Sequence, residues 1–426
     1  MIDGHLGLAA REAVKQFGTP LYFYDLARLR ADATAIREAF PDPWIRLYSL
    51  KANGVPGLVR EIAAEGFSMS AVSGGELTLA LRASTALDNI VLEGIGKTER
   101  DLSMAALFAA DETPLLWVSL ESREDAAALL DQVTKARRRW PANRRVPLDV
   151  LVRVNPSVAP ETLGVLAVGA PSSKFGVLPE ELASVIEAGG GPDGLIRWRG
   201  IHLHVGSQLG AVDAWRSAFR VGLRLLELQR AELTDFDTLD AGGGFPVAYD
   251  GEAESVPSIA RFAAEANAEL EQLPSAARPR RLAVEPGRAV VAGCGWLLGR
   301  VLHVRRREPP IIVLDTGMTE LIRPAMYGAR HPMFALTSLG QPIDSIGAQQ
   351  MATVRVDGPV CESSDTLGTT SLPPLERGDV VAIGMAGAYA SSMFSTYNGR
   401  QRPPEVAWDD GTLTLLRRRG AYKGLP

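Results

Sequence analysis

The chain has 426 residues, of which 46% are hydrophobic and 22% charged, with a formal net charge of −5 and a pI near 5.7. That length exceeds what one hydrophobic core usually supports, so two domains are expected, and the acidic balance argues against a nucleic-acid or anionic-membrane binder. The sequence contains neither an apolar run long enough to span a membrane nor a signal-peptide pattern. Its only cysteines, Cys294 and Cys361, are too few for a disulfide framework. A cytoplasmic protein is expected.

The predicted elements begin with a turn and strand over residues 18–24, after which Asp25 could cap a helix that runs to about Phe40. Short apolar strands then alternate with amphipathic helical patterns. The eight candidate strands cover residues 45–50, 67–72, 90–93, 115–120, 148–154, 200–205, 236–241 and 281–284. The clearest helical patterns cover residues 55–65, 75–83, 122–139, 180–187, 212–231 and 259–273.

This alternation predicts a (β/α)₈ barrel, with a doubly wound open sheet as the alternative. The strand ends favour the barrel, because nearly all of them carry a residue capable of chemistry, whereas an open sheet uses only two or three. These residues are Lys51, Ser73, Glu93, Glu121, Asn155, His204, Gly242 to Gly244 and Glu285.

Beyond Pro286 the helical periodicity gives way to β-prone runs separated by Gly and Pro, which predict a mainly antiparallel second domain. The runs cover residues 296–304, 311–315, 351–356, 380–383 and 412–416, and a short helix is expected over residues 389–397. The predicted domains are therefore a barrel over residues 27–282 and a β domain over residues 283–426. The first 26 residues are candidates to join the second domain.

Lys51 is the first candidate catalytic residue, because it follows the strand of residues 45–50 at the mouth of the predicted barrel. Apolar neighbours there would lower the pKa of its amine by desolvation. A neutral amine can form a Schiff base with an aldehyde. The alternative is a structural lysine with a packed stem and a solvated head. The chain has only six lysines, however, which makes one at a strand end conspicuous.

Two further segments follow late strands. Gly242, Gly243 and Gly244 could present uncovered backbone amides to a phosphate, although a tight turn is the commoner use of such a run. His202 and His204 share one face of a strand. A zinc hydrolase would need more ligands at neighbouring strand ends, so no metal is expected, and an imidazole there could instead stack on a flat cofactor ring. The other histidines lie elsewhere, at His5, His303 and His331.

The last barrel strand ends in Glu285-Pro286-Gly287-Arg288. Its acid and base could form a surface ion pair worth up to about 1 kcal/mol. Alternatively, Glu285 could pair with a pyridinium nitrogen while Arg288 binds a carboxylate or phosphate. Cys361 and Tyr389, in the second domain, lie in turn-like contexts where a buried thiol and a packed aromatic are the simpler interpretations.

In order, these segments resemble the fold-type III pyridoxal-phosphate (PLP) decarboxylases of amino acids, most closely the diaminopimelate decarboxylases. Each motif is weak alone, and the ordered set is specific and spans nearly the whole chain. The motifs are residues 48–53, 73–76, 173–176, 204–208, 242–244, 285–288, 323–328, 361–365 and 387–389. The resemblance implies a PLP-binding barrel of the alanine-racemase type, a C-terminal mainly β domain, and a homodimer with shared active sites.

The resemblance also implies site residues. Lys51 would hold PLP covalently, His204 would stack on its ring, and Glu285 would keep the ring nitrogen protonated. The other cofactor contacts would be Ser207, Gly242, Gly243, Gly244, Gly287, Arg288 and Tyr389. Substrate contacts would be Arg288, Arg323 and Tyr327 for a distal carboxylate, Glu362 for a distal amine, and Tyr389. Cys361, reaching across the dimer interface, would help to protonate the carbanion.

Decarboxylation is expected rather than racemisation, because alanine racemases of this fold place an arginine where Glu285 stands. The expected substrate is meso-2,6-diaminopimelate, giving L-lysine, because Arg323, Tyr327 and Glu362 match family residues that bind a second amino-acid head. Two departures affect the substrate: residues 244–246 are more similar to the ornithine, lysine and arginine branch, and residues 67–72 lack the usual aspartate. Alternatives are a decarboxylase of ornithine or lysine, or one of secondary metabolism acting on a siderophore or antibiotic precursor or a carrier-bound amino acid. A non-catalytic PLP-binding protein and a metal-dependent barrel hydrolase are alternatives from other classes.

Overall fold

The computed structural model describes residues 4–139, 147–169, 172–192, 194–249, 256–336 and 351–422. The chain divides into two compact units. The barrel unit comprises Ala33–Val247 and Ser255–Gly287, and the sheet unit comprises Met1–Asp32, Ala248–Glu254 and Arg288–Pro426. None of the described helices combines the length and apolar character that crossing a bilayer requires.

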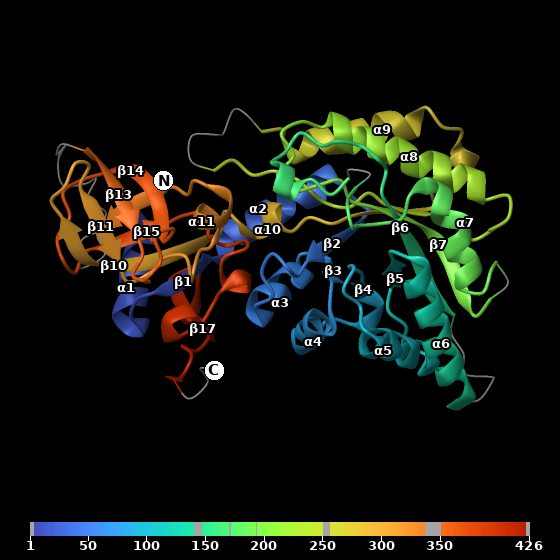
Figure 1. Ribbon diagram of the computed structural model, residues 1–426, viewed down its shortest axis with the longest axis horizontal. Coiled ribbons are helices and arrows are strands. Elements are labelled where there is room, and N and C mark those ends of the chain that lie inside the picture. The colour runs from blue at the N-terminus through green and yellow to red at the C-terminus, as the bar shows by residue number, and fades with distance from the viewer. Residues whose placement is uncertain are drawn as a thin grey trace. The chain divides into compact units, whose positions relative to one another are not determined.

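Eight parallel strands close into a barrel, as the sequence predicts (Figure 1). They are β2 (Ile45–Ser49), β3 (Ser68–Ala71), β4 (Ile90–Leu92), β5 (Trp117–Leu120), β6 (Leu148–Val154), β7 (Ile196–Leu203), β8 (Thr238–Asp240) and β9 (Arg281–Val284). Pairing of Ile45 with Ala283 and of Arg46 with Val284 joins the first strand to the last. The parallel arrangement brings all the carboxyl ends of the strands to one face, which is where barrel enzymes hold their chemistry.

Helices surround these strands (Figure 1). They are α3 (Pro56–Ala64), α4 (Gly74–Arg82), α5 (Glu99–Ala110), α6 (Arg123–Arg139), α7 (Leu182–Ala188), α8 (Asp213–Gln229) and α9 (Ile259–Glu271). Local signals start them: Pro56 opens α3, the Ser73 side chain caps α4, and Thr98 with Asp101 forms a capping box on α5.

Two apolar clusters hold the barrel unit together. One buried cluster is formed by side chains of the barrel strands, namely Leu47, Val91, Trp117, Leu151 and Ala283. A second cluster is aromatic and consists of Phe40, Trp44, Trp215, Phe219, Phe245 and Phe262, with ring centroids 5.0–6.4 Å apart. Phe245 follows the triple glycine directly, so this packing anchors the end of that loop.

The sheet unit contains a mainly antiparallel nine-stranded sheet. Its strands are β1 (Leu21–Asp25), β10 (Gly295–Arg305), β11 (Ile311–Leu314), β12 (Met333–Leu336), β13 (Ala352–Asp357), β14 (Thr366–Leu372), β15 (Val380–Ile383), β16 (Glu405–Asp409) and β17 (Thr412–Arg417). Strand β1 pairs with β10 and β16 and lies blue among the orange and red strands of Figure 1. Helix α1 (Gly4–Phe17) packs its Leu6, Ala10 and Ala13 into the core of this sheet.

The Asp25 cap is confirmed, because its Oδ1 accepts from the amides of Ala27 and Arg28 at the start of α2 (Leu26–Ala39). Several elements differ from expectation. Helix α1 and strands β12, β14 and β16 were not predicted, and β7 begins at Ile196 rather than at Gly200.

The short helix expected over residues 389–397 is wrong. Tyr389 has a φ of 57°, in the left-handed region that an α-helix excludes, and Phe394 has a ψ of 139°, which is not helical. Single 3₁₀ turns, Ser391–Met393 and Tyr397–Gly399, take its place.

Candidate active site

The loop that carries Lys51 begins where β2 ends and is fixed by the backbone on both sides. The amide of Leu50 donates to the Ser70 carbonyl at 3.0 Å, and the amide of Ser49 donates to the Pro286 carbonyl at 3.1 Å. A Cβ at Gly287 would lie only 3.0 Å from Ser49 Cβ, so a residue without a side chain is required for this close approach. The lysine is therefore mounted on a rigid strand end.

His204 follows β7 and is oriented by the triple glycine. The amide of Gly243 donates to His204 Nδ1 at 3.2 Å, which makes Nδ1 an acceptor and leaves the imidazole neutral. Burial lowers the pKa of His204 well below its usual value, and the nearby Lys51 cation lowers it further. The ring is thus neutral and fixed in one orientation.

The triple glycine packs directly on backbone groups. A Cβ at Gly242 would lie 2.1 Å from the Leu203 carbonyl oxygen, and one at Gly243 would lie 2.3 Å from that of Glu285. The amide of Gly242 donates to Asp240 Oδ1 at 2.9 Å, and that of Gly243 is used by His204. Two of the three amides that could bind a phosphate are therefore already hydrogen-bonded within the loop.

A buried cluster of acids and a histidine lies inside the barrel. Glu93 follows β4, Glu285 follows β9, and His202 is on β7. His202 Nε2 lies 3.3 Å from Glu93 Oε2 and 3.5 Å from Glu285 Oε1, so one polar side-chain atom of each of the three residues lies within 4.8 Å of the others. His202 Nδ1 contacts Ser119 Oγ at 2.7 Å. The sequence indicated the two glutamates as strand-end residues but assigned His202 no role.

Burial controls the charges of this cluster. It raises the pKa of Glu93 to about 8, and the neighbouring Glu285 carboxylate adds to the effect. Burial also raises the pKa of Asp240 well above its usual value, and it lowers the pKa of His202 to about 4. At neutral pH, Glu93 is therefore mostly protonated and His202 is neutral.

One ion pair ties the motif of residues 173–176 to the barrel. Arg153 Nη1 lies 2.9 Å from Glu121 Oε1, and Glu121 Oε2 accepts from the Gly176 amide at 3.1 Å. The Arg153 guanidinium also lies 5.0 Å from the centre of the Phe175 ring. This ion pair fixes the loop of residues 173–176, and the charges of Arg153 and Glu121 balance each other.

The sheet unit brings two buried arginines to one tyrosine. Arg288, at the start of α10 (Arg288–Val291), donates to the Tyr249 hydroxyl at 2.7 Å and stacks 4.7 Å from the Tyr389 ring centre. Arg323, at the start of α11 (Arg323–Tyr327), lies 4.6 Å from the centre of the Tyr249 ring. The sequence indicated both arginines and Tyr389 but did not indicate Tyr249.

His331 holds Arg323 without neutralising it. Its Nδ1 donates to the Gly384 carbonyl at 2.9 Å, so its Nε2 is free to accept from Arg323 Nη1 at 2.9 Å. Burial lowers the pKa of His331 to about 3, and the Arg323 cation contributes. Within the described residues, Arg323 forms no ion pair with a carboxylate. A buried cation oriented by neutral groups is suited to binding an anion.

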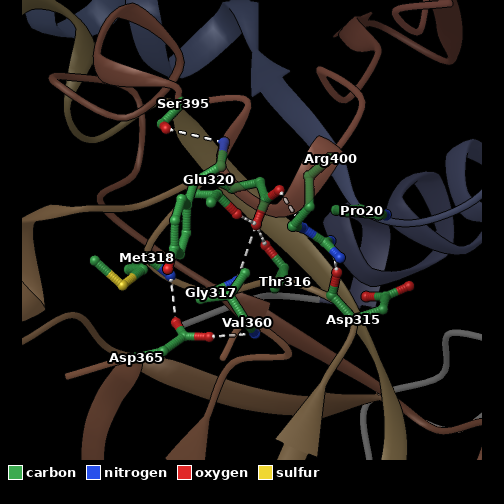
Figure 2. Close-up of polar contacts among 12 residues, drawn as sticks. Pro20, Asp315, Thr316, Gly317, Met318, Glu320, Val360, Asp365, Ser395 and Arg400 are labelled. Atoms are coloured by element: carbon green, nitrogen blue, oxygen red, sulfur yellow. Dashed lines mark hydrogen bonds and ion pairs between the residues drawn. The ribbon is translucent and has the colours of Figure 1, made fainter. Parts of the chain in front are cut away.

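The segment of Cys361 and Glu362 is an exposed loop held by a buried aspartate (Figure 2). Asp365 Oδ1 accepts from the Met318 amide at 2.6 Å, and its Oδ2 accepts from the Val360 amide at 2.8 Å. The loop is therefore joined to the segment of residues 315–320 that precedes α11.

That neighbouring segment is itself fixed by Glu320 (Figure 2). Glu320 Oε2 accepts from the Gly317 amide at 3.0 Å, and its Oε1 pairs with Arg400 Nε at 3.1 Å. Glu320 and Arg400 therefore fix the segment that leads into α11, the helix that begins at Arg323.

Replacing Asp365 with alanine should lower the free energy of unfolding by about 2–4 kcal/mol, because the buried Val360 amide and the partly buried Met318 amide lose their acceptor. The urea midpoint of the full-length chain would measure this loss, and the exposed Glu376→Ala variant is the matched control. An Asp365→Ala midpoint equal to that of the control would contradict the role of Asp365 in holding the loop.

Comparison with known proteins places the chain. The family model of the pyridoxal-dependent decarboxylases, for their pyridoxal-binding domain, matches residues 26–292. The chain belongs to the pyridoxal-dependent decarboxylases. It is 36% identical to a diaminopimelate decarboxylase of Deinococcus radiodurans over 96% of both chains, and 32% identical to one of Aquifex aeolicus over 99% of this chain and 94% of the relative.

A solved structure agrees with this family. Diaminopimelate decarboxylase from Helicobacter pylori, crystallised in complex with L-lysine, matches with a TM-score of 0.85 at 27% identity, covering 97% of each chain. The family and the two-part fold expected from the motifs are confirmed.

The site residues predicted for this pyridoxal-dependent decarboxylase fall in both units. Those in the barrel unit are Lys51, His204, Ser207, Gly242, Gly243, Gly244, Glu285 and Gly287. Those in the sheet unit are Arg288, Arg323, Tyr327, Cys361, Glu362 and Tyr389. Sequence reasoning missed His202 and Asp240 in the first unit and Tyr249 and His331 in the second. His202 and His331 were considered only as metal ligands, and an H-x-H pair and a histidine eight residues after Arg323 were the available signals.

Proposed function

We propose that this chain is a PLP-dependent carboxy-lyase that converts meso-2,6-diaminopimelate to L-lysine and CO₂. Relatives that are 32–36% identical over almost the whole chain carry the name diaminopimelate decarboxylase. The observation that carries the substrate assignment is Arg323, a buried cation whose described partners are neutral. Diaminopimelate has a second amino-acid head with a carboxylate, which ornithine and lysine lack.

The barrel unit fits the pyridine ring of PLP. Glu285 Oε1 and His202 Nε2 are buried polar atoms without a hydrogen-bond partner among the described residues. A protonated ring nitrogen would supply the missing donor to Glu285. Lys51, on its rigid strand end, would bind the cofactor aldehyde, and the neutral His204 ring would stack on the pyridine. When bound, PLP supplies a sink for the electrons left at Cα as CO₂ departs.

The remaining cofactor contacts follow from the motifs. We assign the phosphate to Ser207, the loop of Gly242 to Gly244, and Tyr389. Because the amides of Gly242 and Gly243 are engaged, this loop contributes mainly by its shape and by fixing His204. Gly287 allows the strand ends of Lys51 and Glu285 to approach each other.

The chain's own residues would bind the substrate and move a proton. We assign the distal carboxylate to Arg288, Arg323 and Tyr327, the distal amine to Glu362, and contact near the reacting centre to Tyr389. Cys361 would return a proton to Cα after CO₂ leaves. Cys361 and Glu362 are exposed in the single chain, which suits residues that complete the site of a partner, and we infer a homodimer. Both cysteines are free thiols, in keeping with a cytoplasmic enzyme.

A substrate panel tests the assignment. The purified protein would be incubated with PLP and with diaminopimelate stereoisomers, L-lysine, L-ornithine, L-arginine and conjugated diamino acids, and CO₂ and the amine product would be measured. Turnover is expected for meso-diaminopimelate, with L-lysine as the product. Turnover of another compound in its place would refute meso-diaminopimelate as the substrate but leave the assignment of PLP as the cofactor intact. Bound PLP with no turnover at all would instead indicate a non-catalytic PLP-binding protein.

A further inference from the structure

We propose that Glu93 is a positioning residue that carries a proton and donates it in a hydrogen bond to Glu285, so that the pair's negative charge stays on Glu285. This inference rests on the proposed function, in which Glu285 faces the cationic ring of the cofactor. It gives a role to a strand-end carboxyl that the mechanism above leaves unused.

The geometry brings three strands to one point. Glu93, His202 and Glu285 are 4%, 1% and 4% exposed, and their nearest polar atoms lie within 4.8 Å of one another. The Ser70 hydroxyl on β3 contacts the other oxygen of Glu93. Glu93 is therefore held by Ser70, and its carboxyl lies beside His202 and the carboxyl of Glu285.

Two carboxyl groups this close in a dry interior cannot both be ionised unless a cation lies between them. His202 does not supply that cation, because burial lowers its pKa to about 4. We assign the proton to Glu93 because Glu285 is the acid that would face the ring nitrogen, and because burial and the neighbouring Glu285 carboxylate raise the pKa of Glu93 to about 8. A neutral Glu93 is also a hydrogen-bond donor, which a carboxylate cannot be.

The other charged groups around Glu93 do not change this conclusion. Lys51 faces it from the end of β2, and burial raises the pKa of Asp240, on β8, well above its usual value. Arg153 on β6 is paired with Glu121 after β5. Because Lys51 is assigned to the cofactor aldehyde and Arg153 is already paired, the negative charge of this group is assigned to Glu285, opposite the ring nitrogen of the cofactor.

Infrared spectroscopy of the purified full-length holoenzyme tests the proton directly. Wild-type protein is expected to show the carbonyl band of a buried protonated carboxylic acid, to which Glu93 contributes. Glu93→Gln should remove part of this band. Glu121→Gln is the matched control, because the Arg153 ion pair keeps the Glu121 carboxylate ionised, and its band should equal that of the wild type. An undiminished band in Glu93→Gln overturns the proposal.

Rescue by the amide separates a protonated acid from a carboxylate. Glu93→Ala is expected to lower kcat/KM at least about tenfold and to shift the visible absorbance of the bound cofactor, because Glu285 loses its donor. Glu93→Gln, which keeps a donor of the same length, should restore the absorbance and recover kcat/KM to within about threefold of the wild type. A Gln variant as impaired as the Ala variant overturns the proposal, as does stoichiometric divalent metal in the purified protein.

The role of Glu93 and the proposed function can be refuted independently of each other. A protein that binds PLP and releases CO₂ but loses no carboxylic-acid band in Glu93→Gln refutes the role of Glu93 alone. If Glu93→Gln loses the band but the wild-type protein neither binds PLP nor releases CO₂, the proposed function is refuted. The protonated Glu93 would then have no cofactor-facing Glu285 to position.

Discussion

Replacing Lys51 with alanine is expected to lower kcat/KM by at least about 10³-fold and to abolish the visible absorbance of the bound cofactor. The reason is that Lys51 is the amine at the rigid end of β2 and would form the covalent link to the PLP aldehyde. Absorbance of the purified variant and CO₂ release from meso-diaminopimelate measure the two effects. Borohydride reduction of the wild type followed by peptide mapping should locate the cofactor on residue 51.

Lys135→Ala is the matched control, because Lys135 is an exposed lysine of α6 that pairs only with Asp131 one turn away. It should retain both the absorbance and the activity of the wild type. Cofactor found on a lysine other than Lys51 after reduction would refute the assignment of the site to the mouth of the barrel.

Replacing Arg323 with glutamine is expected to lower kcat/KM for meso-diaminopimelate by about 10²-fold, which corresponds to roughly 3 kcal/mol of transition-state stabilisation. The guanidinium would otherwise bind the distal carboxylate through charge-assisted hydrogen bonds. Steady-state kinetics measure the loss, while the absorbance of bound PLP should stay unchanged because Arg323 is assigned to the substrate rather than to the cofactor.

The exposed Arg330→Gln variant, seven residues further along the same unit, controls for a general loss of positive charge. It should behave as the wild type. Equal activity of Arg323→Gln and Arg330→Gln would exclude Arg323 from substrate binding, and the assignment of a two-headed substrate would then lose its main support.

Much of the barrel could be predicted because its strands are short, apolar and bounded by turns. All eight candidate strands overlap observed ones, and the residues at their carboxyl ends gather as parallel pairing requires. The sheet unit was harder to predict. Strands β14 and β16 mix polar and apolar residues, as in Thr366–Leu372, and owe their conformation to pairing with β13, β1 and β17. Such tertiary pairing is not visible in local periodicity.

The cofactor-site motifs could be predicted by resemblance, whereas the residues that set their charges could not. His331 lies eight residues from Arg323, and its tautomer depends on the distant Gly384 carbonyl. Ser70 is on β3 and Glu93 directly follows β4. Their side chains meet only because the barrel pairs these two strands, with Ser70 opposite Val91. The Phe245 departure from the diaminopimelate pattern likewise has a packing role, since its ring lies 5.2 Å from that of Phe262.

The close packing of the triple glycine limits how this enzyme can be re-engineered. A methyl group at Gly242, Gly243 or Gly244 would come within 2.1, 2.3 or 2.6 Å of a carbonyl oxygen. Saturation libraries at these three positions should therefore yield few folded clones, whatever the selected reaction. Laboratory evolution toward new amino acids is better directed at Glu362, the exposed residue assigned to the distal amine, where a side chain can vary without displacing the backbone.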